Sequence, residues 1–107
     1  MKGILSQIAI WIISSQLFAQ LQEVKTYYAA DSLQVREIYY FDQLDSSLNG
    51  TYESFYSNGS LKTFGRYQQN LPDSSWQYYY ENGRKKAEGN FQNGIKNGLW
   101  KFYFENG

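Results

Sequence analysis

The sequence predicts an all-β fold, an elongated antiparallel meander built from tandem β-hairpins. Three observations lead to this prediction. Aromatic residues make up 20% of the 107 residues, and 11 of them are tyrosines; rings of this kind favour strands. Asn-Gly pairs, which are typical of hairpin turns, recur along the chain. The third observation is an internal repeat, whose period equals the distance along the chain from Tyr52 to Trp76.

The repeat runs without gaps through residues 49–107. Large rings, turn dipeptides and glycines all recur at the same spacing, so each repeat is expected to form one hairpin that contacts mainly its neighbours. The recurring positions are Tyr52, Trp76 and Trp100; Tyr56, Tyr80 and Phe104; Asn58-Gly59, Asn82-Gly83 and Asn106-Gly107; and Gly65 with Gly89.

The turn dipeptides fix the pairing that is expected within each hairpin. If Asn82-Gly83 is the centre of a two-residue type I′ turn, Trp76 faces Gly89 across the hairpin. The same count sets Tyr52 opposite a glycine in the preceding hairpin. A flat ring can lie over the bare backbone of a glycine, so we expect these positions to be structural. They are Tyr52, Gly65, Trp76, Gly89, Asn58, Gly59, Asn82 and Gly83.

The same count places a lysine opposite an aromatic ring on the other face of each hairpin. Phe55 faces Lys62, and Tyr79 faces Lys86. Each pair could form a cation–π contact. Alternatively, the lysine stem covers the ring while its ammonium group stays in water.

The segments between hairpins are expected to be turns. Residues 68–74 contain Pro72 and Asp73, which are turn formers, and residues 92–98 contain two Asn-Gly pairs. Residues 20–48 fit a degenerate first hairpin with its turn at Asp31-Ser32. Such a ribbon has one layer and no deep core, so wide aromatic rings must provide most of the burial.

Residues 1–19 are expected to be a secretory signal peptide that is cleaved after Ala19. A positive start at Lys2 precedes a mainly apolar run, residues 4–18, and polar residues follow. The alternative is an uncleaved membrane anchor, but a spanning helix needs roughly 18 or more apolar residues. Residues 4–18 are therefore expected to be helical. The protein is expected to be exported, so that it is periplasmic, associated with the outer membrane, or secreted.

The composition excludes several kinds of chemistry. The chain has no cysteine and no histidine, which removes thiol chemistry, disulfides, histidine acid–base catalysis and the usual zinc sites. Ten basic residues balance ten acidic ones, so no bulk charge draws the protein to nucleic acid. A single-layer ribbon also offers no pocket for two carboxylates with separated pKa values. We therefore expect no enzyme activity, no cofactor, no metal site and no nucleic-acid partner.

Three stretches resemble the variant MORN repeat (membrane occupation and recognition nexus). They are NGTYESFYSNGSLKTFGRY, SSWQYYYENGRKKAEGNFQNG and NGLWKFYFENG, and they look most like the bacterial sub-family of YwqK-type antitoxins. Ser74-Ser75 replaces the usual glycine at one repeat start, and Tyr52 replaces tryptophan in the first clear copy. The resemblance implies scaffolding, partner binding or lipid contact. The antitoxin role fits badly with a signal peptide, because a neutraliser of a cytosolic toxin needs no export.

The function expected from the sequence is an exported, non-catalytic repeat scaffold that binds a partner through its aromatic β-surface. The partner is expected to be a protein or a cell-envelope glycan, since aromatic patches mark interaction surfaces and sugars stack on such rings. The alternatives are an antitoxin-like protein neutraliser and a module that binds the membrane surface. The residues expected to contact the partner are Phe55, Tyr79, Lys86, Trp100, Phe102, Tyr103 and Phe104.

The last strand carries a further expectation. The sequence stops at Asn106-Gly107, within a turn, so the preceding strand, residues 99–104, is expected to have an open edge. An open edge is a template for pairing with another chain. Either the sequence is a fragment of a longer protein, or the protein self-associates through this strand.

Overall fold

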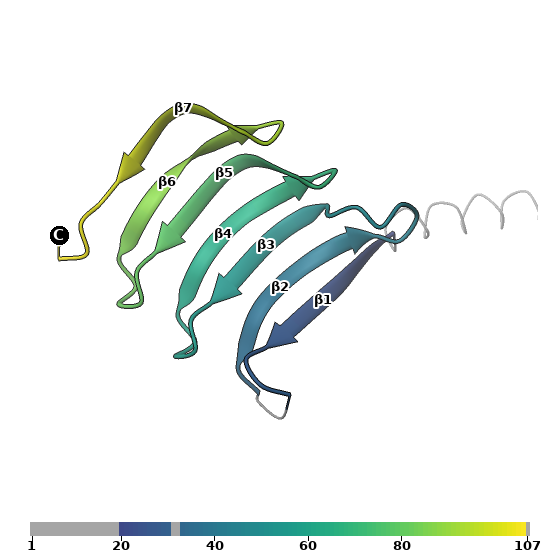
Figure 1. Cartoon of the computed structure of the whole chain (residues 1–107), viewed down its shortest axis with the longest axis horizontal. Coiled ribbons are helices and arrows are strands. Elements are labelled where there is room, and N and C mark those ends of the chain that lie inside the picture. The colour runs from purple at the N-terminus through teal and green to yellow at the C-terminus, as the bar shows by residue number, and fades with distance from the viewer. Residues whose placement is uncertain (1–19, 31–32, 107) are drawn as a thin grey trace, which may run out of the picture.

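The structure, a computed structural model, describes residues 20–30 and 33–106. Figure 1 shows these residues as one open antiparallel sheet in which seven strands follow one another in chain order. This confirms the all-β meander. The helical leader expected at residues 1–19 and the turn residues Asp31-Ser32 lie outside the described residues. The strands are β1 (Leu21–Tyr27), β2 (Val35–Asp42), β3 (Gly50–Phe55), β4 (Leu61–Gln68), β5 (Leu71–Tyr79), β6 (Lys85–Gln92) and β7 (Ile95–Phe102).

The strands β1 and β7 form the two edges of the sheet (Figure 1). Among the described residues β7 pairs with β6 alone, so its other side is open. The strand expected at residues 99–104 begins earlier, at Ile95, and ends at Phe102. Self-association through this edge stays a prediction.

The turns at Asn58-Gly59 and Asn82-Gly83 differ from the expected type. The Gly83 amide donates to the Tyr80 carbonyl at 2.9 Å, and only the glycine of each pair has a left-handed φ, 90° at Gly59 and 91° at Gly83. The strand pairing shifts by one residue directly beside each turn. The expected type I′ turn is therefore wrong, because the glycine forms a bulge after a type I turn instead. The side-chain oxygen of Asn82 accepts from the Arg84 amide at 2.9 Å, which fixes this geometry.

Two-residue turns with the type I′ pattern occur at the other end of the sheet. Gln69 and Asn70 connect β4 to β5 with φ values of 49° and 68°, and Asn93-Gly94 connects β6 to β7 with 52° and 83°. The strands pair immediately beside these turns. The longer turns expected over residues 68–74 and 92–98 are therefore wrong. Pro72 and Asp73 lie within β5, because two left-handed residues suffice to reverse the chain.

The pairing of β4 with β5 is interrupted where a tryptophan folds back over a glycine. The register moves from Phe64↔Gln77 to Arg66↔Asp73, so residues 74–76 lie opposite the single residue Gly65. The same interruption recurs between β6 and β7, opposite the next glycine of the repeat. At each interruption, the tryptophan of the later strand places its indole over the glycine backbone of the preceding strand.

Neither glycine has room for a side chain. A Cβ at Gly65 would lie 2.1 Å from Cδ2 of Trp76, and a Cβ at Gly89 would lie 2.2 Å from Cδ2 of Trp100. The indole N–H donates in each case to the carbonyl of the residue after the glycine, at 3.2 Å for Trp76 and 3.0 Å for Trp100. Ring and backbone are therefore in direct contact and are held there by a hydrogen bond.

The expectation that rings cover glycines is right in kind, but the partners differ. The register pairs Tyr52 with Gly65 and Trp76 with Gly89, as expected. The atoms nearest to a Cβ at each glycine, however, belong to the tryptophan of the following strand. Trp76 thus pairs with the glycine of its own hairpin by register and covers the glycine of the preceding hairpin. It joins two repeats instead of closing one.

A continuous row of rings, which we call the aromatic row, follows this face of the sheet from β3 to β7. Neighbouring ring centroids lie 5.0 to 6.3 Å apart, in stacked, tilted and edge-to-face arrangements. Trp76, near the middle of the row, is 4% exposed, and Ala87 is the other buried apolar residue among those described. The described residues form no second layer on this sheet, so the row takes the place of a core. Its members are Tyr52, Tyr67, Trp76, Tyr78, Phe91 and Trp100.

Tyrosine hydroxyls tie neighbouring hairpins together near the glycine-bulge turns. Tyr56 donates to the carbonyl of Tyr79 at 2.6 Å, and Tyr80, one repeat later, donates to the carbonyl of Tyr103 at 2.6 Å. Tyr28 makes the corresponding contact in the first hairpin. The period of the sequence therefore repeats a hydrogen bond between hairpins as well as a ring contact.

We predict that Gly89→Ala destabilises the fold by about 1–3 kcal/mol, because the new methyl group would occupy the position of the Trp100 indole. Urea unfolding followed by circular dichroism measures the change. In a Trp100→Ala background the indole is absent, so the same substitution should cost less than about 0.5 kcal/mol. An equal cost in both backgrounds would show that the ring is not the reason for the glycine.

We also predict that the fold loses stability in alkali. Burial raises the pKa of Tyr52, Tyr67 and Tyr78 above the ordinary value of about 10. As the pH rises through about 10, the unfolded chain releases phenolic protons that the folded chain keeps, so the free energy of unfolding falls. The urea midpoint should therefore be lower at about pH 10.5 than at about pH 8.

The control for this prediction compares two sets of tyrosine variants. The double variant Tyr67→Phe with Tyr78→Phe should lose less stability between the two pH values than the unmodified protein. Tyr27→Phe, at a position that is 44% exposed, serves as the matched removal of a tyrosine outside the aromatic row. If all three proteins show the same pH dependence, the aromatic row is not its source.

Candidate binding groove

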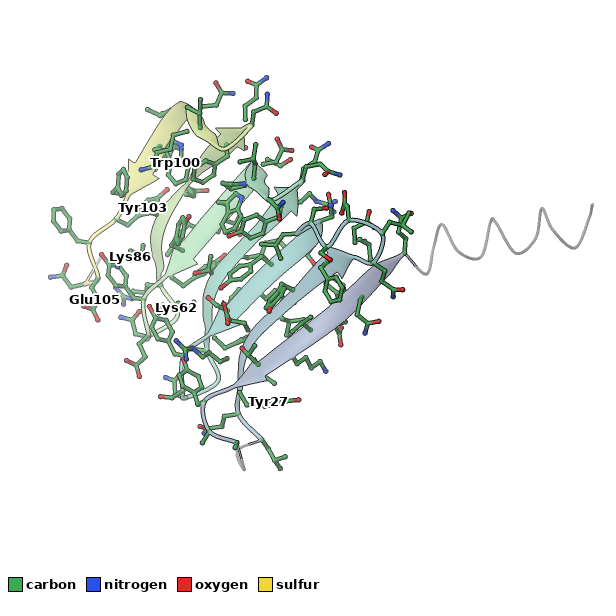
Figure 2. The ribbon with its side chains drawn as sticks, turned by 45° about the vertical axis from the view of Figure 1, so that its right-hand side comes forward. Tyr27, Lys62, Lys86, Trp100, Tyr103 and Glu105 are labelled. Atoms are coloured by element: carbon green, nitrogen blue, oxygen red, sulfur yellow. The ribbon has the colours of Figure 1, made fainter. Side chains whose placement is uncertain are left out.

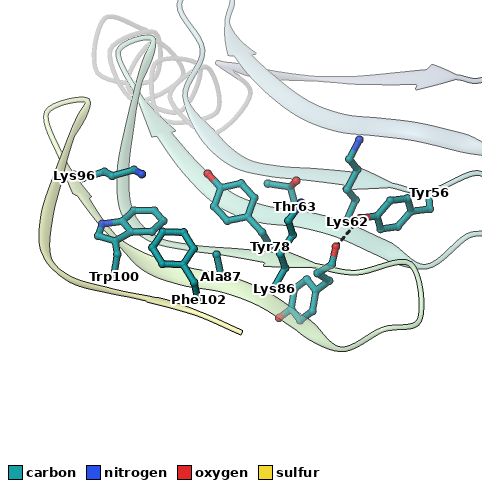
Figure 3. A pocket seen from close by; sticks show the side chains of 10 residues that line it. Tyr56, Lys62, Thr63, Tyr78, Lys86, Ala87, Lys96, Trp100 and Phe102 are labelled. Atoms are coloured by element: carbon teal, nitrogen blue, oxygen red, sulfur yellow. Dashed lines mark hydrogen bonds between the residues drawn. The ribbon is translucent and has the colours of Figure 1, made fainter. Parts of the chain in front are cut away.

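A groove runs over β4 to β7 on the face that carries the aromatic row. Its volume is about 270 Å³. Figure 3 shows Lys96 with Trp100 and Phe102 at one end, Tyr56 and Lys62 at the other, and Tyr78 between them. We call it the aromatic groove. Its lining residues are Tyr56, Lys62, Thr63, Tyr78, Tyr79, Lys86, Ala87, Lys96, Trp100 and Phe102.

The groove exists because small residues and large rings alternate from strand to strand. Thr63 on β4 and Ala87 on β6 occupy the same place in the repeat, and both are buried. Tyr78 on β5 and Phe102 on β7 also share a place in the repeat, and their rings stand above the smaller residues. The floor is therefore formed by short side chains, and the walls are formed by rings.

Two of the three lysines in the groove point there because each lies at a bulge in the strand that follows a glycine-bulge turn. The pairing of β3 with β4 skips Lys62, and the pairing of β5 with β6 skips Lys86. A bulged residue leaves the normal alternation of faces, and its side chain is aimed to the side of its neighbour. Figure 2 shows both lysines near this end of the sheet, with Trp100 farther along β7.

The bulges also change which rings the lysines contact. The Lys62 ammonium nitrogen lies 5.5 Å from the ring centroid of Tyr56, and that of Lys86 lies 5.7 Å from the ring centroid of Tyr80. The contacts expected on the opposite face assumed a register without bulges, and they are wrong. The expected pairs were Phe55 with Lys62 and Tyr79 with Lys86.

The third lysine, Lys96, belongs to β7 and covers the ring that ends the aromatic row. Its ammonium nitrogen lies 4.8 Å from the ring centroid of Trp100 and 5.8 Å from that of Phe102. Phe102 is 68% exposed. This end of the groove therefore combines an accessible ring with a positive charge.

The lysines of the groove have no acidic partner. Over residues 20–30 and 33–106, the ion pairs join Lys25 to Glu23 and Lys85 to Glu88. No aspartate or glutamate lines the groove. The lining thus carries three positive charges although the whole chain is formally neutral.

Two glutamates lie beyond the groove, near the glycine-bulge turns. Burial raises the pKa of the Tyr56 phenol, and the negative charges of Glu81 and Glu105 add to this effect. Their field weakens the positive potential at the Tyr56 end. The Lys96 end is therefore the more favourable place for an anion.

The residues that the sequence predicts to contact a partner lie on separate parts of the sheet. Tyr79, Lys86, Trp100 and Phe102 all line the aromatic groove. Phe55 instead lines a second hollow of about 430 Å³ beside β2. The expected residues therefore do not form a single surface.

Tyr103 and Phe104 lie outside the groove as well. The Tyr103 hydroxyl donates to a Glu88 carboxylate oxygen at 2.6 Å; this hydrogen bond raises the pKa of Tyr103 and lowers that of Glu88. Phe104 is 83% exposed beside the last turn. Figure 2 shows Tyr103 between Trp100 and Lys86.

The sequence prediction missed six groove residues: Tyr56, Lys62, Thr63, Tyr78, Ala87 and Lys96. Lys62 precedes Lys86 by one period of the repeat, so the repeat itself contained the signal. Lys96 has no such counterpart, because Pro72 stands one period earlier.

The chemistry of the groove is that of a binding surface. Rings offer stacking, and ammonium groups offer attraction to an anion. Among the described residues no group of three or more Asp, Glu, His or Cys side chains could hold a metal ion. The same residues include no helix with the length and hydropathy to cross a membrane.

Comparison with known proteins places the chain in a family. The family described as MORN repeat variant matches residues 48–68, 72–93 and 96–107. The first two segments correspond to the hairpins β3–β4 and β5–β6, and the third begins in β7. Repeats of this family are generally non-catalytic. No curated protein and no solved structure matches the chain. On the strength of these matched segments, which cover more than half of its residues, the chain belongs to the MORN repeat variant family.

Proposed function

We propose that the protein is an exported, non-catalytic repeat scaffold that binds a protein or a cell-envelope glycan in the aromatic groove. The observation that carries the proposal is the contrast between two rings of the repeat. Trp76 is 4% exposed and serves the fold, whereas Phe102 is 68% exposed and lines a groove. An exposed ring beside lysines that have no acidic partner among the described residues contributes little burial to the fold and is accessible for binding.

The architecture supports a binding role over a catalytic one. The described residues form a single-layer sheet, so their charged groups face solvent instead of an interior that would shield a reaction from water. Family membership points the same way, because these repeats are generally non-catalytic. The sheet instead presents a long, stiff face whose shape is set by the aromatic row.

The binding proposal predicts that the protein sediments with isolated cell-envelope material through Phe102. Phe102→Ser should reduce the bound fraction by about fivefold or more, since truncating an anchor ring costs upwards of about 1 kcal/mol of binding free energy. Phe64→Ser is the matched control, because Phe64 is 38% exposed and lies on the opposite face of β4. Equal loss in both variants, or no loss in either, would contradict binding at the groove.

The export proposal makes a separate prediction about the leader. When the full chain is produced in a bacterium, mass spectrometry should find a mature protein that begins at Gln20, in the periplasm or the medium. Fractionation of the same cells provides the location. A cytosolic protein that retains residues 1–19 would contradict export, and it would favour the antitoxin-like alternative.

A further inference from the structure

We infer that the ligand of the aromatic groove is an acidic sugar, such as a uronic acid unit of a polysaccharide. This inference rests on the proposed function, which assigns binding to the same face. It goes further by naming the chemistry of the ligand.

The positive charges of the groove favour an anionic ligand. Lys62, Lys86 and Lys96 all line it, and no carboxylate does. Each ammonium group lies over a ring, at 4.8 to 5.7 Å from the nearest centroid. The charges are therefore held at the groove instead of extending freely into solvent, and an anion would meet them without ordering them first.

The aromatic rings of the groove favour a ligand with a partly apolar face that can stack on them. Trp100 and Phe102 line one end and offer ring surface beside the Lys96 ammonium group, and Tyr78 lies between this end and the other. The Tyr78 side chain ends in a hydroxyl, a group that can donate to or accept from a ligand hydroxyl. The volume of about 270 Å³ lies just below the range of roughly 300–1,000 Å³ that is typical of small-molecule sites. One or two sugar rings fit this description.

Other anions use only part of the groove. A peptide that adds to a sheet needs unpaired backbone; β4, β5 and β6 are each paired on both sides, so among the described residues only the open edge of β7 offers it beside the groove. A lipid acyl chain needs a deep apolar slot, but the sheet has a single layer and a floor of short side chains. An acidic pyranose uses both features at once: its C–H face stacks on a ring, and its carboxylate meets an ammonium group.

The test uses two probes of equal size. Oligogalacturonate carries a carboxylate on each unit, and its methyl ester carries none. Calorimetric titration of the mature chain should show binding of the acid and at least about tenfold weaker binding of the ester. The affinity for the acid should fall with rising salt, because the contact is partly ionic.

Two neighbouring lysines provide matched variants. Lys96→Gln should weaken binding of the acid by about fivefold or more. Lys101→Gln removes the same charge from the same strand, but Lys101 alternates to the face away from Trp100 and Phe102, so its effect should stay within about twofold. Both variants keep the rings that stabilise the fold. Equal losses would mean that only the net charge matters, and this would overturn the inference.

The remaining outcomes separate this inference from the proposed function. Equal binding of acid and ester, or binding of neither, overturns the acidic sugar. If sedimentation with envelope material still depends on Phe102, the scaffold proposal survives that result. Binding of polyglutamate or of anionic lipid vesicles with the same Lys96 dependence, in place of the oligosaccharide, assigns the groove to another anion and overturns the inference. If the protein binds none of these probes and does not sediment with envelope material, both the acidic-sugar inference and the proposed function are overturned.

Discussion

The contact between an indole and the backbone of a glycine is the interaction on which the rest of this structure depends. A single-layer sheet cannot bury side chains against a second layer, so Trp76 and Trp100 pack against the sheet's own backbone, where Trp76 is buried and Trp100 is half-buried. A tryptophan buries roughly 150–250 Å², which corresponds to several kcal/mol at about 25 cal/mol per Å² before entropy is counted. The contact is possible only where the neighbouring strand has no Cβ. It also joins one hairpin to the next, so it provides the cohesion between repeats.

The same packing solution creates the aromatic groove. Short side chains must lie beside the covering rings, and this alternation leaves a groove along Thr63 and Ala87. The bulged turns then move one lysine per repeat from the far face to the near face, where it lies over a tyrosine ring. A positively charged, ring-lined groove is therefore a direct consequence of how the repeat holds itself together. The proposed binding requires in addition only that the rings and charges at one end stay accessible.

The period and the strand register could be predicted from the sequence because Asn-Gly turns fix a hairpin to within one residue. The sequence leaves the pairing beside each turn uncertain by one residue, and this residue determines which side chains line the groove. A type I turn with a glycine bulge and a type I′ turn both use Asn-Gly, yet they differ in the face on which Lys86 lies. The cover over Gly65 was also assigned to the wrong ring, because the contact with Trp76 crosses between hairpins. Counting within one hairpin cannot reveal such a contact, and Lys96 has no repeat counterpart that would have marked it.

The end of the aromatic row shows why one surface can serve both stability and binding. Trp76 has rings around it, including Phe91 of the following strand at 5.9 Å. Trp100 lies in β7, which has no following strand among the described residues, and Lys96 covers it instead. A cation–π contact at an exposed site contributes only about 0.5–1 kcal/mol. Lys96 can therefore shield the ring while the groove is empty and turn its ammonium group toward an anion at little cost. A hydrophobic cover in its place would protect Trp100 equally well but would offer a ligand no charge.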